Sequence, residues 1–260
     1  MKRSLINILI QRYPEEDEKV LTSAIMQGNI IVNNQKISKP GYKVDEKIEV
    51  TWNKKNKYVS RGAYKLLHAL ENFDFPVLNK IGLDAGCSTG GFTQVLIENG
   101  CRKVYAIDVG TNVLDYKLRI NPRVVVFEKT NVRFIKKQDF CPVPDFSVVD
   151  VSFTSLQGII ENLFKIINGS KIIALIKPQF EVKLPKHEFS GVINDDSIIK
   201  NCLLNLNDYF KNFRIYINQL TASPIKGREG NKEFLALFST VNKNWNLKQN
   251  MNKIFKNDCL

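Results

Sequence analysis

The stretch Ile81-Gly-Leu-Asp-Ala-Gly-Cys-Ser-Thr-Gly-Gly-Phe-Thr93 decides the fold of this 260-residue chain. It begins with a short apolar run, passes an acid at Asp84, and turns through small residues before a helical pattern of apolar side chains. A strand, a glycine-rich turn and a helix in this order bring backbone N–H groups close to a ligand at the strand ends of a doubly wound α/β sheet. The stretch therefore predicts a ligand-binding loop in an α/β domain.

Three kinds of site share this outline. A dinucleotide site is incomplete, because Ser88 stands at the second glycine of the G-x-G-x-x-G fingerprint. Gly86-Cys-Ser-Thr-Gly90 has the spacing of a hydrolase nucleophile elbow, but His187 is the only histidine that follows it. An S-adenosylmethionine (AdoMet) site would place Asp84 at the cationic methionine end and use Asp108, after the next apolar run, for the ribose hydroxyls. A hydrolase needs neither acid, so the pair favours AdoMet.

Composition limits the class of protein. Hydrophobic residues make up 43% of the chain and charged residues 25%, as in a soluble globular protein. No apolar run is as long as a membrane span, and the N-terminus has no signal-peptide cleavage pattern, so we expect a cytoplasmic protein without a membrane partner. Five scattered cysteines without a C-x-x-C pair argue against a disulfide framework and a zinc site. The net charge of +12 indicates a polyanionic partner, most often nucleic acid.

Residues 1–51 are predicted to form a small α+β domain. Their pattern indicates a helix ending near Pro14, a second helix closed by Gly28, a short hairpin, and a last strand at Lys47–Thr51. This order resembles the S4 RNA-binding domain. The second helix begins with the acidic run Glu15–Glu18 instead of basic residues, which disfavours strong RNA binding by this domain alone.

The remainder divides into a polar linker at 52–57, a large domain at 58–242 and a basic C-terminal tail at 243–260, which we expect to be a packed helix with one solvated face. In the large domain, Ser60 is expected to cap a helix that carries Lys65 and His68, the latter as a structural residue. Strand-like and helix-like segments then alternate, which predicts a Rossmann-like α/β sheet. The expected strands are 81–83, 104–107, 124–127, 146–151, 171–176, 213–217 and 234–238, and the expected helices include 91–99, 155–167 and 196–211.

Four charged residues stand where this sheet would bind a ligand. Asp150 and Lys177 end predicted strands, Glu233 begins the last one, and Lys65 comes from the helix before the sheet. A charge at the end of a buried strand is costly unless it is paired, so we expect a Lys-Asp-Lys-Glu cluster. Each residue alone fits an ordinary ion pair at the rim of a sheet, but the set of four beside an AdoMet loop favours a catalytic site.

The chain resembles the hemolysin A-like (TlyA) family, whose catalytic part resembles FtsJ-type RNA 2′-O-methyltransferases. The matches follow the family order from the S4-like start to about residue 240. They are Val59-Ser-Arg-Gly-Ala-Tyr-Lys65, Leu83–Thr93, Ala106-Ile-Asp-Val-Gly110, Pro122-Arg-Val-Val-Val126, Lys129-Thr-Asn-Val-Arg133, Val149-Asp-Val-Ser-Phe153, Ile176-Lys-Pro-Gln-Phe-Glu181, Ser190-Gly-Val192, Ala222-Ser-Pro224 and Gly230-Asn-Lys-Glu-Phe234.

This resemblance implies an AdoMet-dependent enzyme that methylates the ribose 2′-hydroxyl of cytidines in ribosomal RNA, with ribosomal RNA or ribosomal subunits as the partner. It implies a catalytic tetrad of Lys65, Asp150, Lys177 and Glu233. The implied AdoMet contacts are Asp84, Gly86, Ser88, Gly90, Gly91 and Phe92, with Asp108 at the ribose and Asn131 near the adenine.

A ribose hydroxyl is a weak acid, so attack on a methyl group requires proton removal and in-line placement. Lys177 is the preferred base, with Lys65 as the neighbouring cation that would favour its neutral form. Because Asp150 opposes that effect, a positioning role for Lys177 is the alternative. Methylation of a base atom fits less well, because Cys141 precedes its strand and the strand end lacks an Asn-Pro-Pro-Tyr motif. The remaining alternatives are an RNA-binding protein without catalysis and a membrane-active cytolysin.

Overall fold

The computed structural model describes the whole chain except residues 1, 53–56, 183–190, 228 and 258–260. The chain divides into two compact units, Met1–Lys57 and Tyr58–Leu260. Most of the expected linker at 52–57 and the end of the expected tail at 243–260 therefore lie outside the described residues. Trp52 belongs to a strand of the first unit, so that strand extends one residue beyond the predicted boundary.

The N-terminal unit packs two short helices against small antiparallel sheets. Leu5, Leu9, Leu21 and Ile25 are fully buried between them. Asp17 caps the second helix by accepting a hydrogen bond from the backbone N–H of Lys19 at 2.7 Å. Its elements are β1 (Lys2–Ser4), α1 (Leu5–Arg12), α2 (Glu18–Met26), β2 (Ile30–Val32), β3 (Gln35–Lys36), β4 (Lys43–Asp45) and β5 (Val50–Trp52), with pairings β1–β4 and β3–β2–β5.

The second unit is built on a seven-stranded sheet in the order β11-β12-β10-β9-β6-β7-β8. The five strands from β10 to β8 are parallel, whereas β12 runs antiparallel to both β10 and β11. The predicted Rossmann-like sheet is thus confirmed. The strands are β6 (Ile81–Ala85), β7 (Lys103–Ile107), β8 (Val124–Phe127), β9 (Phe146–Val149), β10 (Lys171–Ile176), β11 (Tyr216–Ala222) and β12 (Phe234–Ser239).

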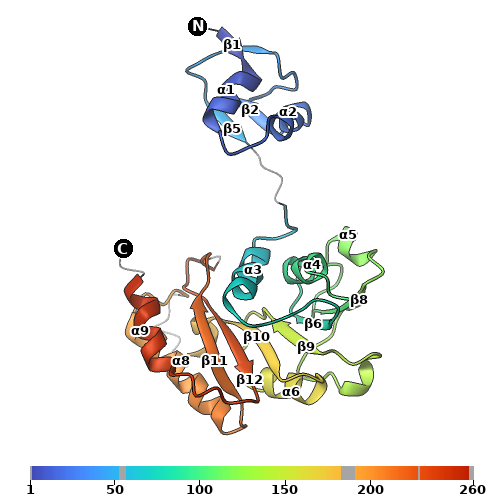
Figure 1. Ribbon diagram of the computed structural model, residues 1–260, viewed down its shortest axis with the longest axis vertical. Coiled ribbons are helices and arrows are strands. Elements are labelled where there is room, and N and C mark those ends of the chain that lie inside the picture. The colour runs from blue at the N-terminus through green and yellow to red at the C-terminus, as the bar shows by residue number, and fades with distance from the viewer. Residues whose placement is uncertain (1, 53–56, 183–190, 228, 258–260) are drawn as a thin grey trace. The chain divides into compact units, whose positions relative to one another are not determined.

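Helices cover both faces of this sheet (Figure 1). Ala63 and Leu66 of α3 and Val95 and Leu96 of α4 pack in one apolar cluster, and α6, α8 and α9 contribute to the cluster on the other face. In α9, Leu247, Met251 and Phe255 are buried, which confirms the predicted packed terminal helix. The helices are α3 (Gly62–Asn72), α4 (Gly91–Glu98), α5 (Tyr116–Arg119), the 3₁₀ turn η1 (Lys137–Asp139), α6 (Ile159–Ile166), α7 (Pro178–Glu181), α8 (Asp196–Lys211) and α9 (Leu247–Asn257).

Several predicted boundaries are wrong. The apolar run at 213–217 is predicted to be a strand, but Phe213 is exposed and β11 begins at Tyr216. The helix predicted at 155–167 begins at Ile159, because residues before it form a loop. Ser60 does not cap α3: Arg61 occupies the N-cap position, and its side chain makes no capping hydrogen bond.

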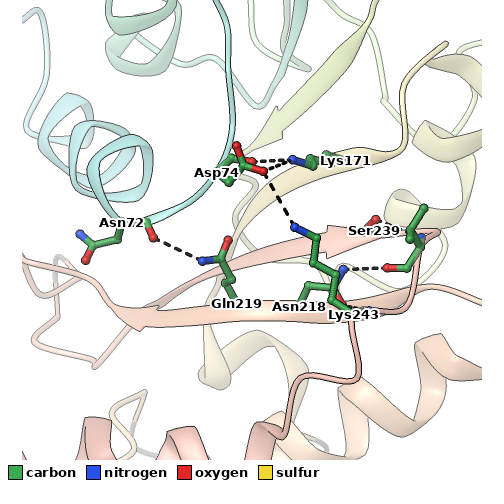
Figure 2. A network of polar contacts seen from close by, with 8 residues as sticks. Asn72, Asp74, Lys171, Asn218, Gln219, Ser239 and Lys243 are labelled. Atoms are coloured by element: carbon green, nitrogen blue, oxygen red, sulfur yellow. Dashed lines mark hydrogen bonds and ion pairs between the residues drawn. The ribbon is translucent and has the colours of Figure 1, made fainter.

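The strand order reverses between β6 and β9, since β7 and β8 lie on one side and β9 and β10 on the other. A reversal of this kind opens a crevice beyond the carboxyl ends of the two strands. At the opposite end of the sheet, polar contacts tie α3 to the strands (Figure 2). There the Lys171 side chain donates to the carbonyl and carboxylate oxygens of Asp74, and Gln219 donates to the carbonyl oxygen of Asn72.

Candidate active site

The glycine turn after β6 runs close to the neighbouring strands. The backbone N–H groups of Gly86 and Cys87 both donate to the carbonyl oxygen of Ile107 at the end of β7. Gly86 has a φ of +84°, and a Cβ atom there would lie 2.6 Å from the carbonyl oxygen of Asp150. A side chain at Gly86 would therefore push the turn away from the β9 end, so this position requires glycine.

The start of α4 is equally crowded. A Cβ atom at Gly90, where φ is +97°, would lie 2.3 Å from Leu118, and one at Gly91 would lie 2.2 Å from the Ser60 hydroxyl. These two glycines are required by contacts with α5 and with the start of α3. Ser88 has a φ of +48°, which is uncommon for a residue with a side chain and marks a locally constrained turn.

Asp84 is the most deeply buried acid of the site. Its carboxylate is inaccessible to solvent and accepts a hydrogen bond from the Thr93 hydroxyl at 2.6 Å. The other oxygen, Oδ1, accepts no hydrogen bond from the described residues. Burial raises the pKa of Asp84 to about 7, the hydrogen bond from Thr93 opposes this rise, and the nearby charge of Asp150 adds to it. Asp84 is thus a buried acceptor with unused capacity.

Asp108 fastens two loops together. Its oxygens accept hydrogen bonds from the backbone N–H of Ser88 at 2.8 Å and from that of Gly110 at 2.7 Å. Each carboxylate oxygen can accept a further bond, so this arrangement leaves room for a ligand hydroxyl. Asn131, expected near an adenine, is exposed, and its side-chain oxygen accepts a bond from the backbone N–H of Arg133.

The four charged residues form two ion pairs. Lys65 Nζ donates to Glu233 Oε2 at 2.6 Å, and both side chains are buried. Lys177 Nζ lies 2.7 Å from Asp150 Oδ1 and donates a hydrogen bond to the Ser152 hydroxyl, also at 2.7 Å. Asp150 Oδ1 accepts no aligned hydrogen bond from the described residues. The Lys177–Asp150 contact is therefore an ion pair, and the Asp150 carboxylate can still accept a hydrogen bond.

A cavity of about 630 Å³ brings both ion pairs to the glycine turn. All four residues of the proposed tetrad line it, as do Gly86, Ser88, Gly91 and Phe92. Phe92 is otherwise buried in the apolar cluster with α3. The other predicted cofactor contacts, Asp84, Gly90, Asp108 and Asn131, are not among the residues that line the cavity.

The sequence interpretation missed other residues of this wall. Ser152 contacts Lys177, and Phe153 has a φ of +61° with 90% of its surface exposed. The Phe153 ring lies 5.3 Å from that of Phe180. Asn231 binds the segment just before α8, because its side-chain oxygen accepts a hydrogen bond from the backbone N–H of Ile193. Their position beside Asp150, Lys177 and Glu233 in the sequence was the available signal.

Over the described part of the chain, no helix is long and apolar enough to cross a bilayer.

Comparison with known proteins identifies the family. The model of the FtsJ-like methyltransferase family matches residues 58–240. YqxC of Bacillus subtilis, provisionally named an rRNA methyltransferase, is 39% identical over 238 residues, which cover 90% of this chain and 84% of YqxC. The 16S/23S rRNA (cytidine-2′-O)-methyltransferase TlyA of Mycobacterium tuberculosis is 33% identical over 89% of this chain and 88% of its own length.

A solved structure covers both units of the chain. A Streptococcus thermophilus protein provisionally named a hemolysin is 34% identical and superposes with a TM-score of 0.71, covering 99% of this chain and 98% of that one. These matches confirm the resemblance inferred from the motifs. The chain belongs to the FtsJ-like methyltransferase family and, within it, to the hemolysin A-like (TlyA) proteins.

Proposed function

We propose that this methyltransferase uses AdoMet to methylate the ribose 2′-hydroxyl of a cytidine in ribosomal RNA. The observation that supports this most strongly is the meeting of the Lys65–Glu233 and Lys177–Asp150 pairs in one cavity with the glycine turn. Relatives named for this reaction are similar over most of the chain. The proposed catalytic residues are the four members of these pairs.

The residues present fit AdoMet as the cofactor. The Gly86 turn leaves no space for a side chain, so backbone groups can approach a ligand closely. Asp84 Oδ1 is a buried acceptor without a partner among the described residues, which suits a cationic group with hydrogen-bond donors. We place the ribose hydroxyls at Asp108 and the adenine towards Asn131, with the loop residues Gly86, Ser88, Gly90, Gly91 and Phe92 around the cofactor.

When bound, AdoMet supplies an electrophilic methyl group for transfer to the ribose oxygen. The bond between the methyl carbon and the cofactor's sulfur would break as the new C–O bond forms. The hydroxyl must lose its proton in this step, and Lys177 Nζ, in its neutral form, would accept it. Asp150 lies 2.7 Å from that nitrogen and holds it against the cavity wall together with Ser152. Lys65, oriented by Glu233, supplies a second positive charge to the same cavity.

The RNA partner also agrees with the charge and the N-terminal unit. A net charge of +12 favours association with a polyanion. The N-terminal unit has two helices followed by the β2–β3 hairpin, which is the order of an S4 domain, and we assign it a role in docking the RNA. A ribosomal substrate places the reaction in the cytoplasm.

Transfer of a labelled methyl group from AdoMet to undermethylated ribosomal subunits tests the proposal. We expect the label on a cytidine 2′-oxygen after mapping of the modified nucleotide. Label on a base atom, or no transfer to any ribosomal RNA, would contradict the assignment. The cytolysin alternative makes a different prediction, which is haemolysis by purified protein that persists in a Lys177→Ala variant.

A further inference from the structure

The loop between β9 and α6, residues 150–158, carries three groups into the cavity. Asp150 and Ser152 contact Lys177, and Phe153 lies beside Phe180. The loop has no helix or strand before Ile159. Phe153 also has a left-handed backbone, a conformation that persists only where the surrounding structure enforces it. Contacts from outside the loop must therefore hold it in place.

Glu181, the last residue of α7, supplies such contacts. Its Oε2 accepts a hydrogen bond from the Ser155 hydroxyl at 2.5 Å, and its Oε1 accepts one from the backbone N–H of Leu156 at 2.8 Å. The Ser155 hydroxyl in turn accepts a hydrogen bond from the backbone N–H of Gln157 at 3.0 Å. Both oxygens of Glu181 therefore bind the loop. Hydrogen bonds to a carboxylate are short and strong, so these two contacts hold the loop firmly.

These bonds join the same two segments as the ion pair does. Lys177, the N-cap residue of α7, contacts Asp150 and Ser152 at the cavity, and Glu181, four residues later, binds Ser155 and Leu156. Side-chain contacts therefore link the segment 177–181 to the loop at two places, one at Lys177 and one at Glu181. Arg133 holds the other side of the loop by donating to the Thr154 hydroxyl at 2.8 Å.

We propose that Glu181 is a positioning residue for methyl transfer, because it holds the loop at the separation that the Lys177–Asp150 contact requires. The proposal rests on the proposed function. Glu181 does not line the cavity, so it acts through Lys177, Asp150 and Ser152.

The use of a carboxylate at this place supports the inference. Burial raises the pKa of Glu181, and the bonds from Ser155 and Leu156 counteract that rise. A part-buried charge costs stability, and a packed apolar side chain would hold α7 at no such cost. A carboxylate alone can accept from both loop donors at once. Glutamine keeps one acceptor oxygen for the Leu156 N–H, but its amide N–H₂ can contact the Ser155 hydroxyl only by donating to it, which reverses that bond and removes the negative charge.

Glu161 offers a matched control. It is a buried glutamate on the neighbouring helix α6, its Oε1 accepts a hydrogen bond from the Tyr209 hydroxyl at 2.6 Å, and it does not line the cavity. Replacing Glu161 removes a comparable buried bond without touching the loop before α6. Differences between variants of the two glutamates therefore separate positioning from general destabilisation.

The experiment compares Glu181→Gln, Glu181→Ala, Glu161→Gln and Glu161→Ala in the full chain. We expect Glu181→Ala to lower kcat about 100-fold and Glu181→Gln about tenfold, with AdoMet Kd within threefold of wild type, because small misplacements of catalytic groups cost rates of this order. The Glu161 variants should keep kcat within about twofold while lowering the melting temperature. Hydrogen exchange of the amides in 150–156 should accelerate in the Glu181 variants alone.

A Glu181→Ala kcat within about twofold of wild type, or unchanged exchange in 150–156, would overturn the proposal. Equal losses of kcat in the Glu161 variants would also overturn it, since the effect would then be general. If Glu181→Ala fails to fold, the kinetics and exchange of Glu181→Gln decide between the two outcomes by the same criteria. Failure of the proposed function shows differently: wild-type protein then methylates no ribose oxygen, while the exchange comparison still decides whether Glu181 holds the loop.

Discussion

Strand β10 has a lysine–aspartate contact at each end, and the two differ in their surroundings. At its start, Lys171 donates to Asp74 Oδ2 at 3.0 Å, with 28% and 73% of the two side chains exposed (Figure 2). Just past its end, Lys177 lies 2.7 Å from Asp150, with only 9% and 21% exposed. Water screens the first pair, so it contributes little to stability. The second pair is largely desolvated beside a cavity, as expected of a functional site.

Two acids near opposite ends of the sheet, Asp74 before β6 and Asp84 within β6, have pKa values shifted in opposite directions. The hydrogen bond from Lys171 and its charge lower the pKa of Asp74, so its contribution to stability is lost as the pH falls through that lowered value. Burial raises the pKa of Asp84 to about 7. Its folded state therefore binds a proton more tightly than the unfolded chain, and stability is lost as the pH rises from about 4 to about 7. Both residues are aspartates, so their surroundings account for the opposite pKa shifts: a lysine partner at Asp74 and burial at Asp84.

Removing the Lys177 amine should have the largest effect. We expect Lys177→Ala to lower kcat at least about 10³-fold, because it removes the proposed proton acceptor, while AdoMet binding stays intact. Lys177→Arg distinguishes the two possible roles, since arginine cannot become neutral and can serve only for positioning. Methyl-transfer kinetics with calorimetric measurement of AdoMet binding make the comparison. Near-normal transfer by Lys177→Ala would show that the base assignment is wrong, and activity of Lys177→Arg above about a tenth of wild type would favour positioning.

Neutralising Glu233 should have the next largest effect. Glu233→Gln leaves the buried Lys65 ammonium without its ionic partner at 2.6 Å, so we expect kcat to fall about 10²-fold. Glu71→Gln, an exposed change on the same helix as Lys65, is the control and should leave kcat unchanged. Equal kinetics for the two variants would remove the Lys65–Glu233 pair from the catalytic site.

Asp84→Asn tests the buried acid through two measurements. AdoMet affinity should fall about tenfold, because an amide cannot pair with a cationic group as a carboxylate does. In the absence of ligand the same change should stabilise the protein at pH 8, since no buried charge then forms. The rise from 3.8 to about 7 sets an upper limit of about 4 kcal/mol on this gain. Denaturant unfolding at pH 5 and pH 8 checks the sign, and a wild-type protein with no loss of stability between these values would contradict it.

The smallest effect is expected at the exposed end of β10. Lys171→Met and Asp74→Asn remove a solvent-exposed pair, so kcat should be unchanged and the melting temperature should stay within about 2 °C of wild type. Thermal unfolding and the methyl-transfer assay test this. A tenfold loss of kcat in either variant would mean that the contacts in Figure 2 control the position of Lys65 through α3, and the contrast between the two ends would fail.

Most strands inside the sheet could be predicted because they are buried on both faces and read as continuous apolar runs, as in β7 and β10. The predicted bounds of β11 are wrong because this strand is not a continuous apolar run. It is an edge strand, it contains the polar residues Asn218, Gln219 and Thr221, and its register shifts between Ile217 and Gln219. A bulged, partly polar edge strand has no regular alternation from which a pattern can locate it.

The sequence alone determined the α/β class, the glycine turn and the identities of the four charged residues, because strand ends and small-residue turns are local features. The tertiary structure decided which charges meet. Lys65 pairs with Glu233 across 168 positions, and Lys177 binds Ser152 as well as Asp150. It also placed Asn131 outside the cavity and brought Glu181 to the loop before α6. These contacts depend on strand order and burial, which follow from packing of the whole domain and from no single segment of the chain.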